Sequence, residues 1–114
     1  MFYEPIPELD ASEIEQAIKR NDAKELSIAV LSAALYHKAE FAESTCQRLA
    51  GHSDCNVRGN AILGFSHVAR LHGCLNKELV HPVVAAALGD EDDYVRMHAH
   101  DVKDDLEHWL RWKF

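Results

Sequence analysis

The segment GHSDCNVRGNA at Gly51–Ala61 recurs as GDEDDYVRMHA at Gly89–Ala99. The glycine, an aspartate, the Val-Arg pair and the alanine all return at one offset of 38 residues. A fixed period of this length is typical of stacked helical repeats, in which each unit buries its apolar face only against its neighbours. Such stacks mostly serve as surfaces that hold another molecule, so the repeat favours binding over catalysis.

The composition indicates one folded domain. The chain has 114 residues, of which 47% are hydrophobic and 27% are charged, and this balance is typical of a globular protein with its own core. It has no apolar run long enough to span a membrane, and Met1–Pro5 lacks the basic start and apolar core of a signal peptide. Its three cysteines have no metal-type spacing. We therefore expect a cytoplasmic protein with reduced cysteines.

The net charge of −7 excludes some partners and favours others. Nucleic-acid binding needs clustered lysine and arginine, which this chain lacks. Most of the negative charge lies between residues 90 and 107, where eight acidic side chains are opposed only by Arg96 and Lys103. The charge fits a basic protein partner, or solubility alone.

Capping residues and helical periodicity predict six helices and no strand. We expect an extended lead-in over residues 1–9, followed by helical pairs over residues 10–37, 38–72 and 75–112 of a single domain, 1–114. The second helix of each pair should begin directly after an N-capping aspartate. These aspartates are Asp22, Asp54 and Asp92.

Two further expectations concern the ends of helices. Glu25, three residues after Asp22, predicts a capping box. Trp109 continues the apolar stripe of the last helix and should close the open end of the stack. Trp112 and Phe114 could belong to that cap or could contact a partner.

Residues 40–110 resemble HEAT repeats. In that family a unit is two antiparallel helices, the turn carries an aspartate, and the second helix opens with Val-Arg and then alanine. The matching residues here are Asp54, Val57, Arg58 and Ala61, and then Asp92, Val95, Arg96 and Ala99. The resemblance implies an all-α fold, a short right-handed α-solenoid of about three HEAT-like hairpins. It also implies that the arginine joins neighbouring turns, and we expect Arg58 to pair with Asp92.

Two functional classes built on this architecture do not fit the residues. The iron-dependent hydroxylases use His-Glu dipeptides at helix starts, whereas this chain has only the reversed pair Glu107-His108 near a helix end. The DNA glycosylases need a basic concave face. In size, acidity and compactness the chain is similar to small immunity proteins of bacterial contact-dependent growth inhibition systems. That resemblance implies a non-enzymatic antitoxin that blocks one nuclease toxin.

The last helix carries the clearest candidate surface. Tyr94, His98, Asp101, Asp105 and His108 recur at helical spacing and so lie on one face. A ribonuclease cleft attracts phosphates with basic side chains, and carboxylates on this face would mimic them. The alternative is a solvated face that only aids solubility. The full set of predicted partner-binding residues is Asn60, His67, Asp93, Tyr94, Met97, His98, Asp101, Asp104, Asp105 and His108.

No other chemistry stands out in the sequence. We find no nucleophile–base arrangement and no glycine-rich phosphate loop, and nothing requires a cofactor. Asp101, Asp104 and His108 are the best candidates for a metal face, but we predict no catalytic or metal site. The hypothesis is an immunity protein, monomeric in a 1:1 complex with a basic nuclease toxin, with ribonuclease the favoured class. The alternatives are a HEAT-like adaptor within a larger assembly and, more remotely, a metal-dependent enzyme.

Overall fold

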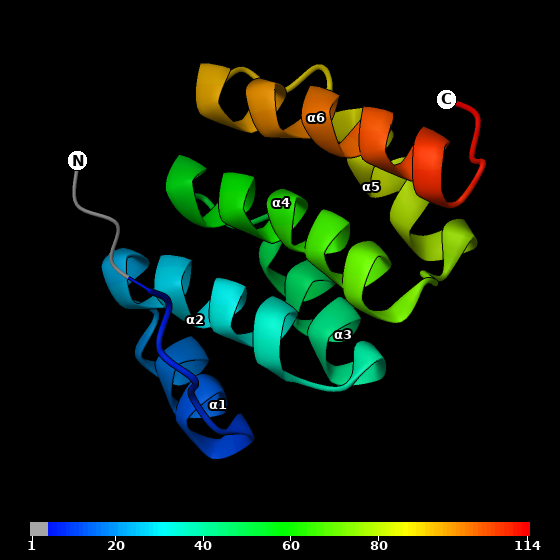
Figure 1. Ribbon diagram of the computed structural model, residues 1–114. Coiled ribbons are helices and arrows are strands. Elements are labelled where there is room, and N and C mark those ends of the chain that lie inside the picture. Colours follow the sequence, from blue (N-terminus) through cyan, green and yellow to red (C-terminus); the bar gives the residue numbers. More distant parts are fainter. Residues whose placement is uncertain (1–4) are drawn as a thin grey trace.

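The computed structural model describes residues 5–114, and this part of the chain contains six helices and no strand (Figure 1). The helices are α1 (Ala11–Arg20), α2 (Ala23–Tyr36), α3 (Ala39–Leu49), α4 (Cys55–His72), α5 (Lys77–Ala87) and α6 (Asp93–Trp109). The all-helical prediction is confirmed. Of the expected lead-in, residues 1–4 lie outside the described residues, and residues 5–9 have no regular secondary structure.

The helices form two layers. Helices α2, α4 and α6 lie side by side and run in the same direction, α3 and α5 lie behind them, and α1 lies below α2 (Figure 1). Helix α4 is central because it packs against α2, α3, α5 and α6. Its side chains Phe65 and Val68 are fully buried, together with Ile14, Leu26 and Leu106 from other helices. Within residues 5–114 no helix has both the length and the apolar character needed to cross a membrane.

Each helix of the α2–α4–α6 layer starts after the aspartate that the sequence predicted. Asp22 accepts a hydrogen bond from the Glu25 N–H at 3.0 Å. Asp54 accepts from two backbone N–H groups of α4, and Asp92 accepts from two of α6. The second hydrogen bond of the predicted capping box, from the Asp22 N–H to Glu25, does not form. The Glu25 carboxylate accepts from Arg20 at 2.8 and 2.9 Å instead.

The 38-residue sequence repeat is also a repeat of hydrogen bonds. Arg58 donates through Nη1 to the carbonyl of His52, six residues earlier, at 3.1 Å. Arg96 donates through Nη1 to the carbonyl of Asp90, also six residues earlier, at 2.6 Å. Each arginine therefore ties the start of its own helix to the turn that precedes it.

Arg58 also joins the two turns, although its partner is not the predicted Asp92. Its Nε and Nη2 donate to the two carboxylate oxygens of Asp90 at 3.1 and 2.9 Å. Asp92 is occupied by the capping of α6, which leaves Asp90 to face the neighbouring turn. Hydrogen bonding to Arg58 holds the pKa of the Asp90 carboxyl below its usual range.

The C-terminal aromatic residues are arranged differently from the prediction. Trp109 is 42% exposed, whereas Trp112 is only 7% exposed and belongs to the core. Helix α6 ends at Trp109, and Arg111 adopts a left-handed backbone conformation with φ of 60°. This reversal folds Trp112 back against the core, where its backbone N–H donates to the Leu106 carbonyl at 3.3 Å. Phe114 stacks on the His81 ring with centroids 4.2 Å apart.

Candidate partner-binding surface

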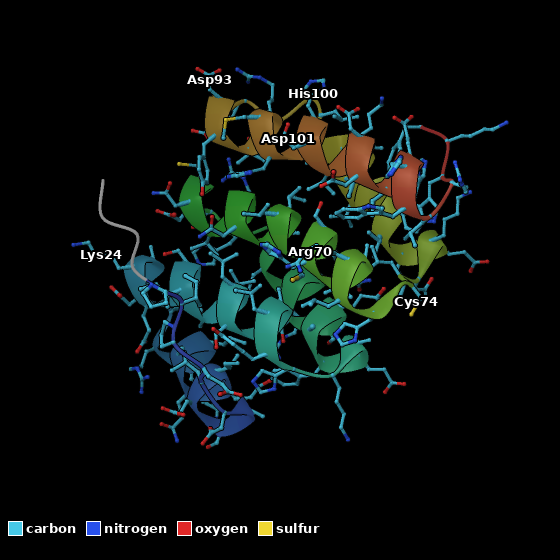
Figure 2. The ribbon with its side chains drawn as sticks, in the orientation of Figure 1. Lys24, Arg70, Cys74, Asp93, His100 and Asp101 are labelled. Atoms are coloured by element: carbon cyan, nitrogen blue, oxygen red, sulfur yellow. The ribbon has the colours of Figure 1, made fainter. Side chains whose placement is uncertain are left out.

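The predicted residues lie on α4 and α6, which are neighbours in the α2–α4–α6 layer. On α6 the buried positions are Val95, Ala99, Val102 and Leu106. Because these recur every three or four residues, they fix one face of α6 against the core and turn the rest outward. Figure 2 shows Asp93 at the start of α6, Asp101 midway along it and Arg70 over the neighbouring α4.

The structure joins Tyr94 and Asn60, two of the predicted residues. The Tyr94 hydroxyl donates to Asn60 Oδ1, and Asn60 Nδ2 donates to the Ser27 carbonyl at 2.9 Å. One chain of hydrogen bonds thus links α6, α4 and α2. The Tyr94 ring lies directly over Gly59, where a Cβ would come within 2.5 Å of it. Burial raises the pKa of the Tyr94 hydroxyl, which keeps it protonated and donating.

His98 packs beside Tyr94 where α4 and α6 meet. The two rings meet edge to face at 4.5 Å and 89°. Burial lowers the pKa of His98, and the negative charge of Asp101 only partly opposes this effect. His98 is therefore neutral at pH 7, and its Nδ1 is buried without a hydrogen-bond partner among the described residues.

His67 and Asp105 are also held by neighbours. Asp105 accepts a hydrogen bond from the Ser66 hydroxyl at 2.9 Å, which joins α6 to α4. Arg70 donates to His67 Nδ1 at 3.2 Å. Burial lowers the pKa of His67, and Arg70 adds to this effect while Asp105 opposes it.

The remaining predicted residues are exposed. Met97 is 51% exposed, and Asp93, Asp101, Asp104 and His108 also face solvent. Asp93 pairs with Arg96, whereas no ion pair is recorded for Asp101 and Asp104 in the part of the chain that the structure describes. The predicted set therefore divides into two groups. Asn60, His67, Tyr94, His98 and Asp105 are buried or half-buried and held by neighbouring side chains, and the others, mostly carboxylates, are exposed and available to a partner.

A hollow of about 240 Å³ lies where α2, α4 and α6 begin. We call it the notch. Its lining residues are Ala23, Lys24, Ser27, Asp54, Asn56, Asn60 and Tyr94. Of these, only Asn60 and Tyr94 belong to the surface predicted from the sequence. Nothing local in the sequence marks the others as neighbours, because they meet only when the three helices stack.

No metal site forms among residues 5–114, since no three histidine, cysteine, aspartate or glutamate side chains gather as ligands. The spacing of Asp101, Asp104 and His108 thus does not produce one in this structure.

Comparison with known proteins shows a similarity of fold. No family model matches this chain, and no curated protein matches it in sequence. Among solved structures, a chain in the crystal structure of the CDI complex from Cupriavidus taiwanensis LMG 19424 has a similar fold. The TM-score is 0.81 at 24% sequence identity, and the match covers 96% of this chain and 97% of that chain. The two chains therefore share a fold over nearly their whole lengths.

Proposed function

We propose that this protein is the immunity protein of a contact-dependent growth inhibition system, and that it binds and neutralises a nuclease toxin. The observation that carries the proposal is the full-length fold similarity to a chain of a CDI complex. A net charge of −7 favours the immunity role over the toxin role, because a nuclease must attract phosphates. We take the protein to be a short right-handed solenoid of HEAT-like pairs that acts in the cytoplasm as a monomer in a 1:1 complex.

The exposed part of α6 would carry the contact. Asp101 and Asp104 present carboxylates without recorded ion-pair partners, and Met97 adds an exposed apolar side chain between them and Asp93. A ribonuclease active site is the favoured target because its basic side chains bind phosphates, which these carboxylates would replace. Tyr94 and His98 are fixed against α4, so this part of the surface is ordered before a partner arrives.

A capture experiment tests the proposal. Tagged protein is mixed with lysate of the source organism, washed at low and high salt, and analysed by mass spectrometry. We expect one stoichiometric basic partner with a toxin-like C-terminal domain, whose nuclease activity is abolished at a 1:1 ratio and whose toxicity this protein relieves. Several partners from one assembly would favour the adaptor instead. Growth arrest caused by this protein alone would assign it to the toxin side.

Charge reversal tests the surface. Asp101→Lys with Asp104→Lys should weaken binding to the recovered toxin by roughly 100-fold or more, since each close charge pair is worth about 1.5 kcal/mol or above. Asp105 is a poorer choice because its loss also breaks the bond to Ser66. The matched control is Glu40→Lys with Glu78→Lys, which makes the same charge change at exposed positions of α3 and α5. Equal affinities of the two double variants, measured by calorimetry, would refute the α6 surface.

A further inference from the structure

The notch at the start of α2, α4 and α6 has the size of a site for one side chain. Its volume of about 240 Å³ is below the roughly 300–1,000 Å³ of pockets that hold small-molecule ligands. Three helices contribute to its walls, so it exists only in the folded stack. It borders the proposed toxin-binding surface, because Tyr94 belongs to both.

The walls of the notch offer more hydrogen-bond acceptors than donors. Asp54 uses Oδ1 for both capping bonds, and Oδ2 accepts none within the described part of the chain. The Tyr94 oxygen donates its only proton to Asn60 and keeps its lone pairs, while Asn60 Oδ1 has a second lone pair. The Ser27 hydroxyl donates to the Lys24 carbonyl at 2.9 Å, so it too can only accept. The donors in the walls are the side-chain amides of Asn56 and Asn60 and the ammonium of Lys24. The surplus of acceptors favours an occupant that donates hydrogen bonds.

The charge around the notch also selects the occupant. Three helix N-termini would favour an anion, but Asp22, Asp54 and Asp92 already accept from the first N–H groups of these helices. Each of these aspartates adds a negative charge at this end of the layer. Among residues 5–114, Lys24 is the only cation that lines the notch, and its side chain extends outward from the start of α2 (Figure 2). Asp54 balances it within the lining, and the neighbouring capping aspartates Asp22 and Asp92 make this end of the layer favour a cation.

The notch is rigid. The Tyr94 ring packs on Gly59, and its hydroxyl is hydrogen-bonded to Asn60. Asn60 is in turn hydrogen-bonded to the Ser27 carbonyl. A site whose groups are already fixed loses little conformational entropy when it is filled. Rigid pockets that accept a single arginine or aromatic side chain are typical centres of binding energy in protein interfaces.

We propose that the notch receives one basic side chain of the partner, and that the planar guanidinium of arginine, with five donors, fits it best. That this side chain belongs to a toxin rests on the proposed function. The preference for a cation rests only on the notch.

The first test needs no toxin. Isotope-labelled protein is titrated with N-acetyl-arginine methylamide and, in parallel, with the glutamate analogue, and followed by NMR. Arginine should cause saturable shifts of the Asn56 and Asn60 side-chain amides and the Tyr94 ring, with Kd of order millimolar for so small a probe. The glutamate analogue should not. Equal shifts from both probes, or no saturable shift from arginine, would overturn the proposal.

The second test uses the toxin domain once it is recovered. Tyr94→Phe should weaken binding about 10-fold, because it removes the hydroxyl oxygen that accepts a hydrogen bond from the charged side chain. Lys24→Ala should strengthen it several-fold by removing a like charge from the lining, whereas Lys19→Ala on α1, with the same loss of charge, should not. Thermal unfolding of each variant checks that the fold is intact. Weaker binding of Lys24→Ala would overturn the proposal.

The two tests separate the two hypotheses. If the arginine probe binds in the notch and no toxin is found, the proposed function fails and the cation preference stands. If a toxin is neutralised but Tyr94→Phe and Lys24→Ala bind it like the native protein, the function stands and the notch proposal fails.

Discussion

At the scale of single residues, Arg58 connects the turn before α4 to the turn before α6 by binding Asp90, 32 residues further along the chain. Its side chain is 14% exposed and that of Asp90 is 17% exposed, so the pair is largely shielded from water. Arg58 also donates to the carbonyls of His52 and Ser53. Arg58→Ala would leave both carbonyls and Asp90 Oδ2 without this donor, and Asp90 Oδ1 would keep only the Asp92 N–H. We expect the change to lower the free energy of unfolding by about 2–4 kcal/mol. Urea unfolding measures the loss.

Arg48→Ala is the matched control for this prediction. Arg48 bonds to Glu15 at 2.7 Å, but the two side chains are 47% and 43% exposed. Exposed pairs of this kind contribute at most about 1 kcal/mol. If Arg48→Ala lowered the free energy of unfolding as much as Arg58→Ala, the connection between the turns would not be a special source of stability.

The same ion pair predicts a dependence of stability on pH. Because Arg58 lowers the pKa of Asp90 in the folded protein, Asp90 stays ionised there at pH values that protonate it in the unfolded chain. The resulting stabilisation is complete above the unfolded pKa of about 4 and is lost as the pH falls through the lower folded value. Asp90→Asn should therefore cost most near neutral pH, and the difference from the native protein should shrink below about pH 4. Urea unfolding at several pH values tests this, and a constant difference down to pH 3 would contradict it.

Arg58 also shows how far sequence reasoning reaches at this scale. The resemblance to HEAT repeats implied that this arginine joins neighbouring turns, and it does. The choice between Asp90 and Asp92 could not be made, because it depends on which carboxylate caps α6. The prediction that Trp109 closes the core was wrong, and the choice between cap and contact for Trp112 was left open, for a similar reason. Periodicity continued through Trp109, but the left-handed Arg111 that turns Trp112 inward has no marker in the sequence.

At the scale of helices, Gly64 allows α4 to approach α2 and α3 closely. A Cβ at this position would overlap the Sγ of Cys46 and lie 3.2 Å from the Cβ of Ala34, and both neighbours are fully buried. Alanine improves helix propensity by up to about 1 kcal/mol, but overpacking a rigid core costs about 1–3 kcal/mol. We expect Gly64→Ala to lower stability by about 1–2 kcal/mol in thermal or urea unfolding.

Two further variants identify the cause of that loss. Cys46→Ala should recover part of the stability of Gly64→Ala, because it removes the overlapping sulfur, and a double-mutant cycle would show coupling between the two sites. Gly51→Ala should stay within about 0.5 kcal/mol, since a Cβ there meets no atom within 4 Å. Additive effects of the Gly64 and Cys46 changes would argue against a steric origin.

The helices themselves were largely predictable, because their boundaries depend on local chemistry. Asp54 and Asp92 cap α4 and α6 as expected, and Gly73 ends α4 in the left-handed conformation that glycine favours. The candidate surface was less predictable. Which face of α6 is exposed followed from its apolar stripe, but the bonds of Tyr94 to Asn60 and of Asp105 to Ser66 cross between helices. Such contacts depend on the depth and register of stacking, which periodicity alone does not give.

At the scale of the whole molecule, the stacking order predicts an uneven distribution of stability. Helix α4 packs against four other helices, whereas α1 packs chiefly on α2 and buries only Ile14 and Ala17. Opening α1 therefore exposes little apolar surface, but opening α4 dismantles the core. In native-state hydrogen exchange, amides around Phe65 and Val68 should exchange only through global unfolding, and their free energy should match that from urea unfolding. Amides of α1 should exchange at a free energy at least about 2 kcal/mol lower and with weaker urea dependence. Uniform protection of α1 and α4 would mean that the six helices unfold as one unit, and the division into stacked pairs would then describe the architecture but not its energetics.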